Sequence, residues 1–519
     1  MTDKLTHQPL LSRRAFVGNA MAGLAGMSAA GRAVAAGLST GNSEITSLTA
    51  LQLSSAIKAK QVSCKEVMSQ YLGQIDRYNG KFNAAVSLAD SDLLLAQANR
   101  ADADLKRGHY RGWMHGFPHL AKDLLDVVGF KTTYGSRIFK DNIANQDSVP
   151  IARIKNAGAI IVGKSNISEF GLGSHSYNRV FGTTLNAYDG ISTAGGSSGG
   201  AATALALQMT PVADGSDMMG SLRNPAGFSN VIGFRPTPGR VPILHSFIEQ
   251  LPCTGPMGRN VSDTAMLLST MAGYDSTMPT SLNEDPAQFA APLRADMKAK
   301  KIAWLGDLNG YLAFEKGVMP LCEKALQSFG EVGCSVDEVR LEYPMEKLWQ
   351  TWLTLRHWVN FGRMNQLYND PNKRRLFKPE SIWEVEGGLT LSAEDIYKAS
   401  QARADFYRVL LAMFDKYDFL VLPTAQVFPF DAKILWPKEI AGKTMDTYHR
   451  WMEVVVLGTL SGCPVINVPA GFSSGGLPMG LQIIGPRYKD FATLQIAYAY
   501  EQASRWNLDY RPASLSTNI

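Results

Sequence analysis

Two glycine- and serine-rich segments place the strongest limits on how this chain folds. The first is Gly195-Gly196-Ser197-Ser198-Gly199-Gly200; the second places Ser221, 24 positions after Ser197, in Asp217-Met218-Met219-Gly220-Ser221-Leu222-Arg223. Both read as turns, because glycine adopts backbone conformations that other residues avoid. Upstream, Lys122 follows the apolar pair Leu120-Ala121. Two serines on such turns together with one lysine are sufficient for a hydrolase that uses neither histidine nor metal.

Around these three residues the chain resembles the amidase signature family. The separations from Lys122 to Ser197 and from Ser197 to Ser221 are similar to those of the family. The resemblance extends from about Thr49 to about Ala503, with its most specific segments at Ser192–Ala202, Asp214–Gly227, Gly233–Val241, Gly462–Gly471 and Gly476–Gln482. It implies an α/β fold, with one large domain over residues 49–519 built on a mixed β-sheet covered by helices.

The resemblance also implies roles for the three residues. Ser221 would attack an amide carbonyl, Ser197 would pass its proton on through a cis Gly196-Ser197 peptide, and Lys122 would be the terminal base. A lysine accepts a proton only when neutral, and its ordinary pKa is about 10.4. Burial lowers that pKa, so we expect Lys122 to be buried among its apolar neighbours and Asp123 to point away from it.

A developing oxyanion needs hydrogen-bond donors already in place. The predicted donors are the backbone N–H groups of Met218, Met219, Gly220 and Ser221. Ser198, Asp217 and Arg223 are predicted to support the site. The family pattern has Gly-Gly before the nucleophile where this chain has Met219-Gly220. The Cβ of methionine restricts φ, so we expect the shape of the substrate site beside Met218 and Met219 to differ from that of relatives.

Three other interpretations remain open. Gly195-Gly196-Ser197-Ser198-Gly199 fits the G-x-S-x-G nucleophile elbow of α/β-hydrolases, which would need a histidine such as His245, His357 or His449. That elbow leaves the Ser221 segment unexplained. A glutamine-hydrolysing amidotransferase subunit resembles the same family, and a non-catalytic binding protein could use the same scaffold.

Substrate choice is expected to lie between residues 270 and 415, where the resemblance thins. Tryptophans gather there, and we predict that Trp352, Trp358 and Phe361, together with Gly171, line the substrate pocket. A pocket of this kind would take an aryl, long-chain or otherwise apolar acyl group. The helical spacing of these aromatic residues fits packing in the core equally well.

The N-terminus is typical of an exported protein. Arg13-Arg14 precedes a glycine- and alanine-rich run and the sequence Ala33-Val34-Ala35, which predicts a twin-arginine signal at residues 1–35 and a lead-in at 36–48. The expected location is therefore periplasmic or secreted, with no membrane attachment after cleavage. Removing that segment reduces the formal charge from +5 to +2, which is too small to indicate nucleic-acid binding.

Local patterns predict an α/β mixture over the rest of the chain. Capping boxes at Thr49 and Ser63 predict helices over about 50–60 and 64–79, a further helix is predicted over 93–107, and apolar runs at 159–162 and 419–422 predict buried strands. Five scattered cysteines show no zinc or thiol-redox spacing, and we assign no disulfide. The resemblance implies no cofactor and no metal. The expected partner is a small-molecule amide, and whether the chain forms a homodimer is left open.

Overall fold

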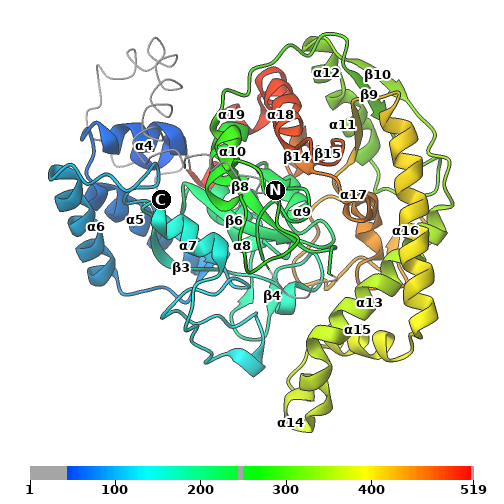
Figure 1. Ribbon diagram of the computed structural model, residues 1–519, viewed down its shortest axis with the longest axis horizontal. Helices are drawn as coiled ribbons and strands as arrows, with labels where there is room; N and C mark the ends of the chain where they lie inside the picture. The colour runs from blue at the N-terminus through cyan, green and yellow to red at the C-terminus, as the bar shows by residue number, and fades with distance from the viewer. Residues whose placement is uncertain (1–43, 244–248, 516–519) are drawn as a thin grey trace, which may run out of the picture. The chain divides into compact units, whose positions relative to one another are not determined.

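An eight-stranded mixed sheet lies at the centre of the computed structural model, which describes residues 44–243 and 249–515 (Figure 1). Its strands follow the order β10 (Ser335–Glu338), β9 (Lys301–Trp304), β11 (Phe419–Pro423), β15 (Pro478–Ile484), β14 (Val465–Phe472), β7 (Ile232–Arg235), β8 (Cys253–Gly258) and β6 (Val212–Asp217). Strand β9 runs parallel to β10 and β11, and the other neighbouring pairs are antiparallel. The sheet is therefore mixed, as the resemblance implied.

A smaller sheet brings Lys122 to the large one. It consists of β1 (Ala85–Val86), β3 (Ile160–Ser165) and β2 (Pro118–Lys122), with β2 parallel to β3 and β1 antiparallel to it. Strand β2 packs against β6 of the large sheet. Because Lys122 ends β2 and Asp217 ends β6, the two strands bring the predicted lysine and the predicted serine turn together. Two short hairpins complete the strands: β4 (Tyr177–Asn178) with β5 (Gly182–Thr183), and β12 (Glu439–Ile440) with β13 (Lys443–Thr444).

The N-terminal helices begin where their capping patterns predict. Helix α4 (Ala50–Lys58) starts after Thr49 and α5 (Cys64–Phe82) after Ser63, each with both hydrogen bonds of a capping box. Helix α6 (Ser91–Lys106) and strands β3 and β11 also confirm their predictions. Short-range capping therefore fixes this part of the fold.

Helices cover the large sheet. Helix α8 (Gly199–Ala206) packs on β6, α9 (Arg223–Phe228) on β7, β14 and β15, α10 (Val261–Met271) on β8, α11 (Val318–Ala325) on β14 and β15, and α18 (Asp490–Ser504) on β14. The long helices α13 (Met345–Asn369), α15 (Pro379–Leu389) and α16 (Ala393–Phe414) pack together, with α15 and α16 both against α13 (Figure 1). The remaining α-helices are α3 (Glu44–Ser47), α7 (Val149–Asn156), α12 (Gln327–Glu331), α14 (Pro371–Arg374), α17 (Val456–Ser461) and α19 (Trp506–Asp509). Short 3-10 turns are η2 (Arg137–Phe139), η3 (Glu169–Gly171), η4 (Pro286–Ala290), η5 (Arg450–Val455) and η6 (Ala513–Leu515).

The fold begins a few residues before the predicted domain boundary at residue 49. Thr46 is buried, its hydroxyl donates to Gln208, and its carbonyl accepts from Arg259 Nη1 at 2.8 Å. The end of the predicted lead-in therefore belongs to the compact unit that starts at Ile45. The predicted signal at 1–35 and the first part of the lead-in lie outside the described residues.

The described residues contain no candidate membrane span and no disulfide bond. No helix in these ranges is both long and apolar enough to cross a membrane. All five cysteines lie in these ranges, and each is buried with a free thiol.

Candidate active site

Lys122 lies at the centre of a buried cluster of hydroxyl groups. Its side chain is fully buried at the end of β2. The Nζ atom donates to Ser197 Oγ at 2.9 Å, to Ser198 Oγ at 2.6 Å and to Ser216 Oγ at 2.9 Å. Ser216, which lies in β6 directly before the second predicted turn, was not among the predicted site residues. Its place in the family segment Asp214–Gly227 could have indicated a role in the site.

The surroundings of Lys122 favour its neutral form. Burial lowers the pKa of Lys122 to about 7, although Asp214 and Asp217 act in the opposite direction. Asp123, the next residue, turns away and accepts hydrogen bonds from the amide of Thr133 at 3.1 Å and its hydroxyl at 2.5 Å. A base that is about half neutral at pH 7 is therefore present beside Ser197.

The backbone around Ser197 is tightly enclosed. The Gly196-Ser197 peptide is cis, and α8 begins directly after Ser198. Gly171, predicted to line the pocket, has a left-handed φ of 71°, and a Cβ there would lie 3.3 Å from Ser197 Oγ. Gly200 has no room for a side chain either, because a Cβ would lie 2.3 Å from the amide of Asn166. The close approach at Gly200 explains why this position of the first turn is glycine.

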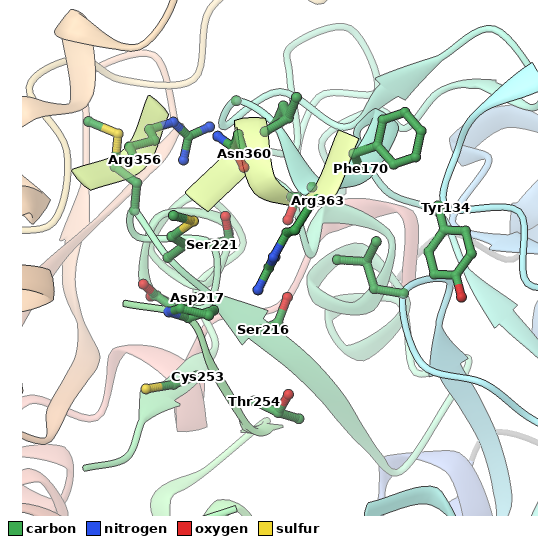
Figure 2. Close-up of a pocket in the computed structure, with 18 of the residues that line it drawn as sticks. Tyr134, Phe170, Ser216, Asp217, Ser221, Cys253, Thr254, Arg356, Asn360 and Arg363 are labelled. Carbon is green, nitrogen blue, oxygen red and sulfur yellow. The ribbon is translucent and has the colours of Figure 1, made fainter. Parts of the chain in front are cut away.

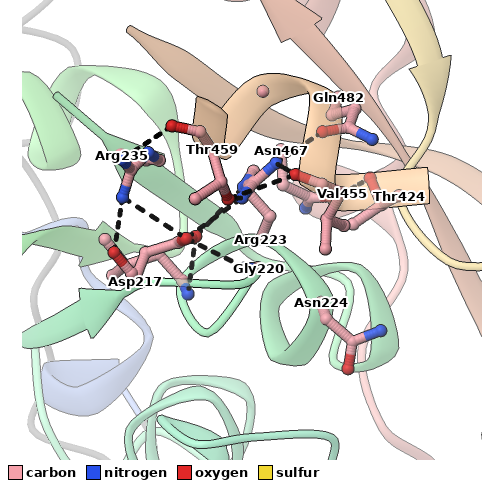
Figure 3. A network of polar contacts seen from close by, with 12 residues as sticks. Asp217, Gly220, Arg223, Asn224, Arg235, Thr424, Val455, Thr459, Asn467 and Gln482 are labelled. Atoms are coloured by element: carbon pink, nitrogen blue, oxygen red, sulfur yellow. Dashed lines mark hydrogen bonds and ion pairs between the residues drawn. The ribbon is translucent and has the colours of Figure 1, made fainter. Parts of the chain in front are cut away.

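Ser221 lies on the turn that joins β6 to α9 and, with Ser197, lines one cavity. A buried ion pair holds this turn, as Figure 3 shows: Arg223 Nε and Nη2 each lie 3.0 Å from one oxygen of Asp217. Arg223 also donates through Nη1 to Val455 O at 3.0 Å and to Gln482 Oε1 at 2.7 Å. The serine turn is therefore tied to the C-terminal part of the chain.

The charge on Asp217 is stabilised by two arginines. Burial acts to raise the pKa of Asp217, but Arg223 and Arg235 outweigh it and hold the pKa at about 2. The carboxylate also accepts from the amides of Gly220 at 2.9 Å and Leu222 at 3.2 Å. Asp217 and Arg223 thus support the turn, as predicted from the sequence, by fixing its backbone.

The contact with Asp217 corrects one predicted oxyanion donor. The N–H of Gly220 is already used by Asp217, so it does not point to a substrate. The N–H groups of Met218, Met219 and Ser221 have no acceptor among residues 44–243 and 249–515. Gly220 has a left-handed φ of 79°, whereas the φ of Met219 is not left-handed. Methionine therefore fits position 219 without backbone strain.

A cavity of about 350 Å³ opens over Ser197 and Ser221 (Figure 2). Met218 and Met219 both line it, and Met219 is almost fully buried. The other apolar lining residues are Leu124, Leu125, Tyr134, Phe139, Phe170, Leu172, Ile243, Met364, Leu367 and Met452. Its walls are mainly apolar, and the polar lining residues are Ser197, Ser216, Asp217, Ser221, Thr254, Arg356, Asn360, Arg363 and His449.

Of the four residues predicted to line the substrate pocket, one lies at this cavity and three do not. Gly171 lines the cavity, whereas Trp352, Trp358 and Phe361 do not. Trp352 is fully buried and stacks on Trp349 with ring centroids 5.2 Å apart. Another face of α13 reaches the cavity, through residues at helical spacing that were not predicted from the sequence: Arg356, Asn360, Arg363, Met364 and Leu367.

No histidine of the described ranges hydrogen-bonds to Ser197. His449 lines the cavity, but its Nδ1 lies 2.8 Å from Thr447 Oγ1, and His357 Nδ1 lies 3.1 Å from Glu384 O. His245 lies outside the described residues. The nucleophile-elbow interpretation therefore lacks its histidine in this structure. Within the same ranges, no group of three or more His, Cys, Asp or Glu side chains could hold a metal ion.

Comparison with known proteins identifies the family. Residues 66–494 match the family model described as Amidase. The chain belongs to the amidase family. It is 32% identical to a glutamyl-tRNA(Gln) amidotransferase subunit of Cyanothece sp., over 88% of this chain and 98% of that one. It is 30% identical to an acylamidase of Rhodococcus erythropolis, over 90% and 97%.

A solved structure agrees with the assignment of this chain to the amidase family. The structure of a bacterial aryl acylamidase of the amidase signature family superposes with a TM-score of 0.83 at 27% identity. The match covers 89% of this chain and 97% of the other. The fold expected from the sequence, a single α/β domain with a helix-covered mixed sheet, is therefore confirmed, and amide hydrolysis is the activity that the family supports.

Proposed function

We propose that this amidase hydrolyses a carboxylic amide through an acyl-enzyme on Ser221, with Ser197 as the proton carrier and Lys122 as the base. The observation that carries the proposal is the 2.9 Å hydrogen bond from a fully buried lysine to Ser197, in a cavity that Ser221 also lines. A serine hydroxyl needs an adjacent base, and a neutral Lys122 supplies one.

The proposed reaction has two halves. In the first, Ser221 Oγ attacks the carbonyl carbon while its proton passes to Ser197 and the Ser197 proton passes to Lys122 Nζ. The N–H groups of Met218, Met219 and Ser221 are available to the oxyanion. Ser197 then protonates the leaving nitrogen, so that ammonia or an amine departs. In the second half, water attacks the acyl-enzyme by the reverse proton route and releases the acid.

The substrate is proposed to be a small amide with an apolar acyl group. The cavity supports this through its walls of leucine, phenylalanine and methionine. The acylamidase relative and the aryl acylamidase structure are consistent with it.

A glutamine-hydrolysing role is the second candidate, favoured by the 32% identity to an amidotransferase subunit. Glutamine carries a charged ammonium and carboxylate at its far end, which an apolar cavity would hold poorly. Hydrolysis of glutamine at a kcat/KM above that of phenylacetamide would favour the amidotransferase role.

We further propose export by the twin-arginine route, on the strength of Arg13-Arg14 and Ala33-Val34-Ala35. Replacing both arginines by lysine should leave the precursor in the cytoplasm. Normal export of that variant would contradict the proposal.

Mass spectrometry of the intact protein during turnover of a slow amide tests the chemical proposal. The expected result is an added acyl mass that maps to Ser221 and is absent from Ser221→Ala. An adduct on Ser197 would reverse the proposed roles of the two serines.

A further inference from the structure

Two arginines reach the mainly apolar cavity from one face of α13. Arg356 and Arg363 are seven residues apart, with Asn360 between them on the same face, and Figure 2 shows Arg356 and Asn360 above Ser221 and Arg363 extending toward Ser216. A bare guanidinium in such a wall would attract an anionic substrate. Whether it does so here depends on what else each arginine binds.

Each arginine is already paired with a carboxylate. Arg363 Nε lies 3.2 and 3.1 Å from the two oxygens of Glu249. Arg356 Nε donates to Glu384 Oε1 at 2.5 Å, and its Nη2 donates to Tyr448 OH at 2.7 Å. Both charges on this wall are therefore balanced before a substrate enters.

The Arg356 pair is the more firmly fixed. Arg356 is 2% exposed and Glu384 is fully buried. Burial acts to raise the pKa of Glu384, but Arg356, together with His357, Tyr448 and Asn360, outweighs it and keeps the pKa below its ordinary value. The ring of Trp352 also lies 5.0 Å from the guanidinium carbon. These contacts hold the guanidinium in one orientation.

The Nη1 group of Arg356 remains without an acceptor among the described residues. The Nε and Nη2 groups are occupied. A donor without an acceptor in an apolar cavity costs free energy, which an acceptor on the substrate would recover. A negatively charged acceptor would lie close to Glu384 in a medium of low dielectric, where like charges repel strongly. A neutral oxygen has no such penalty.

We propose that Arg356 recognises a neutral hydrogen-bond acceptor, such as a carbonyl, ether or nitro oxygen, on the apolar group of the substrate remote from the scissile amide. The substrate class is thus a neutral amide with an apolar, acceptor-bearing group. This inference rests on the proposed function, because it takes the cavity over Ser221 to be the substrate site.

Isosteric substrates test the inference without altering the protein. Phenylacetamides carrying a 4-acetyl, 4-isopropyl or 4-carboxylate group place a neutral acceptor, no acceptor or an anion at the same position. Acetanilides with the same three groups vary the amine side. In at least one series, the acetyl compound should exceed the isopropyl compound in kcat/KM by about tenfold or more, and the carboxylate should be the poorest. No preference for acetyl in either series, or a preference for carboxylate, would overturn the inference.

Variants then assign the effect to Arg356. Arg356→Met should bring the acetyl-to-isopropyl ratio close to one, mainly through KM. Arg356→Gln, which can still donate to Glu384, serves if the methionine variant does not fold by circular dichroism. Arg408→Met is the matched control: Arg408 is exposed, pairs with Asp405 at 2.6 Å on α16, and should leave the ratio unchanged. A ratio unchanged in a folded Arg356 variant would refute the role of this residue.

The two proposals fail in different ways. If the Ser221 acyl adduct forms but the acetyl preference is absent, the inference about Arg356 fails and the catalytic proposal stands. If no adduct forms on Ser221 in the wild-type enzyme, the proposed function itself fails.

Discussion

The pH dependence of kcat/KM should follow the ionisation of Lys122, and Asp214→Asn should move it. Asp214 Oδ2 accepts the backbone N–H of Lys122 at 3.0 Å, and Oδ1 lies 2.8 Å from His119 Nε2. Its negative charge opposes the effect of burial on the pKa of Lys122. Asparagine has the same shape, and its oxygen can accept from Lys122 N–H while its amide donates to His119. The variant therefore removes a charge and keeps the contacts.

The expected magnitudes follow from the Lys122 pKa. An ordinary lysine with a pKa of 10.5 is neutral in roughly one molecule in 3,000 at pH 7, whereas a pKa of about 7 makes it half neutral. Burial thus raises the active fraction about 1,500-fold at pH 7. Below its pKa the activity should fall tenfold per pH unit. Loss of one nearby buried carboxylate lowers such a pKa by roughly 1 unit. At pH 6, Asp214→Asn should therefore keep a share of its own high-pH kcat/KM that is about fivefold larger than the share that wild type keeps.

The assay is kcat/KM for phenylacetamide from pH 5 to pH 9 at constant ionic strength. Asp123→Asn is the matched control, because Asp123 is next to Lys122 in sequence but is not among the charges that act on it. The acid limb should lie near pH 7 in the wild type and in the control, and near pH 6 in Asp214→Asn. A limb that stays in place in Asp214→Asn, or that moves to higher pH, would refute the assignment of Lys122 as the base.

Three further predictions concern stability, each measured by urea unfolding. The pKa of Lys122 in the folded state lies below its unfolded value, so the unfolded state binds more protons and stability rises with pH. Between pH 7 and pH 9 the free energy of unfolding of wild type should therefore increase by about 2 kcal/mol relative to that of Lys122→Met. A difference that does not change with pH would contradict this. Arg223→Met leaves the fully buried Asp217 with Arg235, at 3.6 Å, as its remaining ion-pair partner and should lower stability by about 3–5 kcal/mol. A loss below about 1 kcal/mol would show that the pair is unimportant. Trp352→Ala should lower stability by about 3–5 kcal/mol but leave the KM ratio of phenylacetamide to acetamide within about twofold, since Trp352 does not itself line the cavity. A selective rise for phenylacetamide would show that Trp352 shapes the pocket through Arg356 and His449, which its ring contacts.

Features set by neighbouring residues were predictable from the sequence. The capping boxes at Thr49 and Ser63 need contacts only three residues apart, and both form. The grouping of Lys122, Ser197 and Ser198 followed from family segments, and in the structure Lys122 Nζ donates to both serine hydroxyls, at 2.9 and 2.6 Å. The roles of these residues in catalysis stay a prediction until the adduct is found.

The aromatic residues predicted for the pocket do not line the cavity, because α13 is buried on more than one side. Its aromatic face packs against the core through Trp349 and Trp352, while the face with Arg356 and Asn360 lines the cavity. Aromatic residues ordinarily indicate an apolar pocket, and arginines ordinarily indicate solvent. In α13 this expectation selected the face that does not line the cavity. The reason is that Glu384, 28 residues further along the chain, pairs with Arg356 and allows its burial.

A distant contact also explains why the turn before Ser221 needs glycine at position 220. The sequence suggested that Met219 would restrict the turn, because relatives have glycine there. In the structure the left-handed conformation falls on Gly220, where a Cβ would lie 2.9 Å from Val455 Cγ2. Val455 is 235 positions away, and its segment is tied to the turn through Arg223. Position 220 therefore requires glycine for a reason that no local pattern contains, and position 219 is free to carry a side chain that shapes the cavity wall.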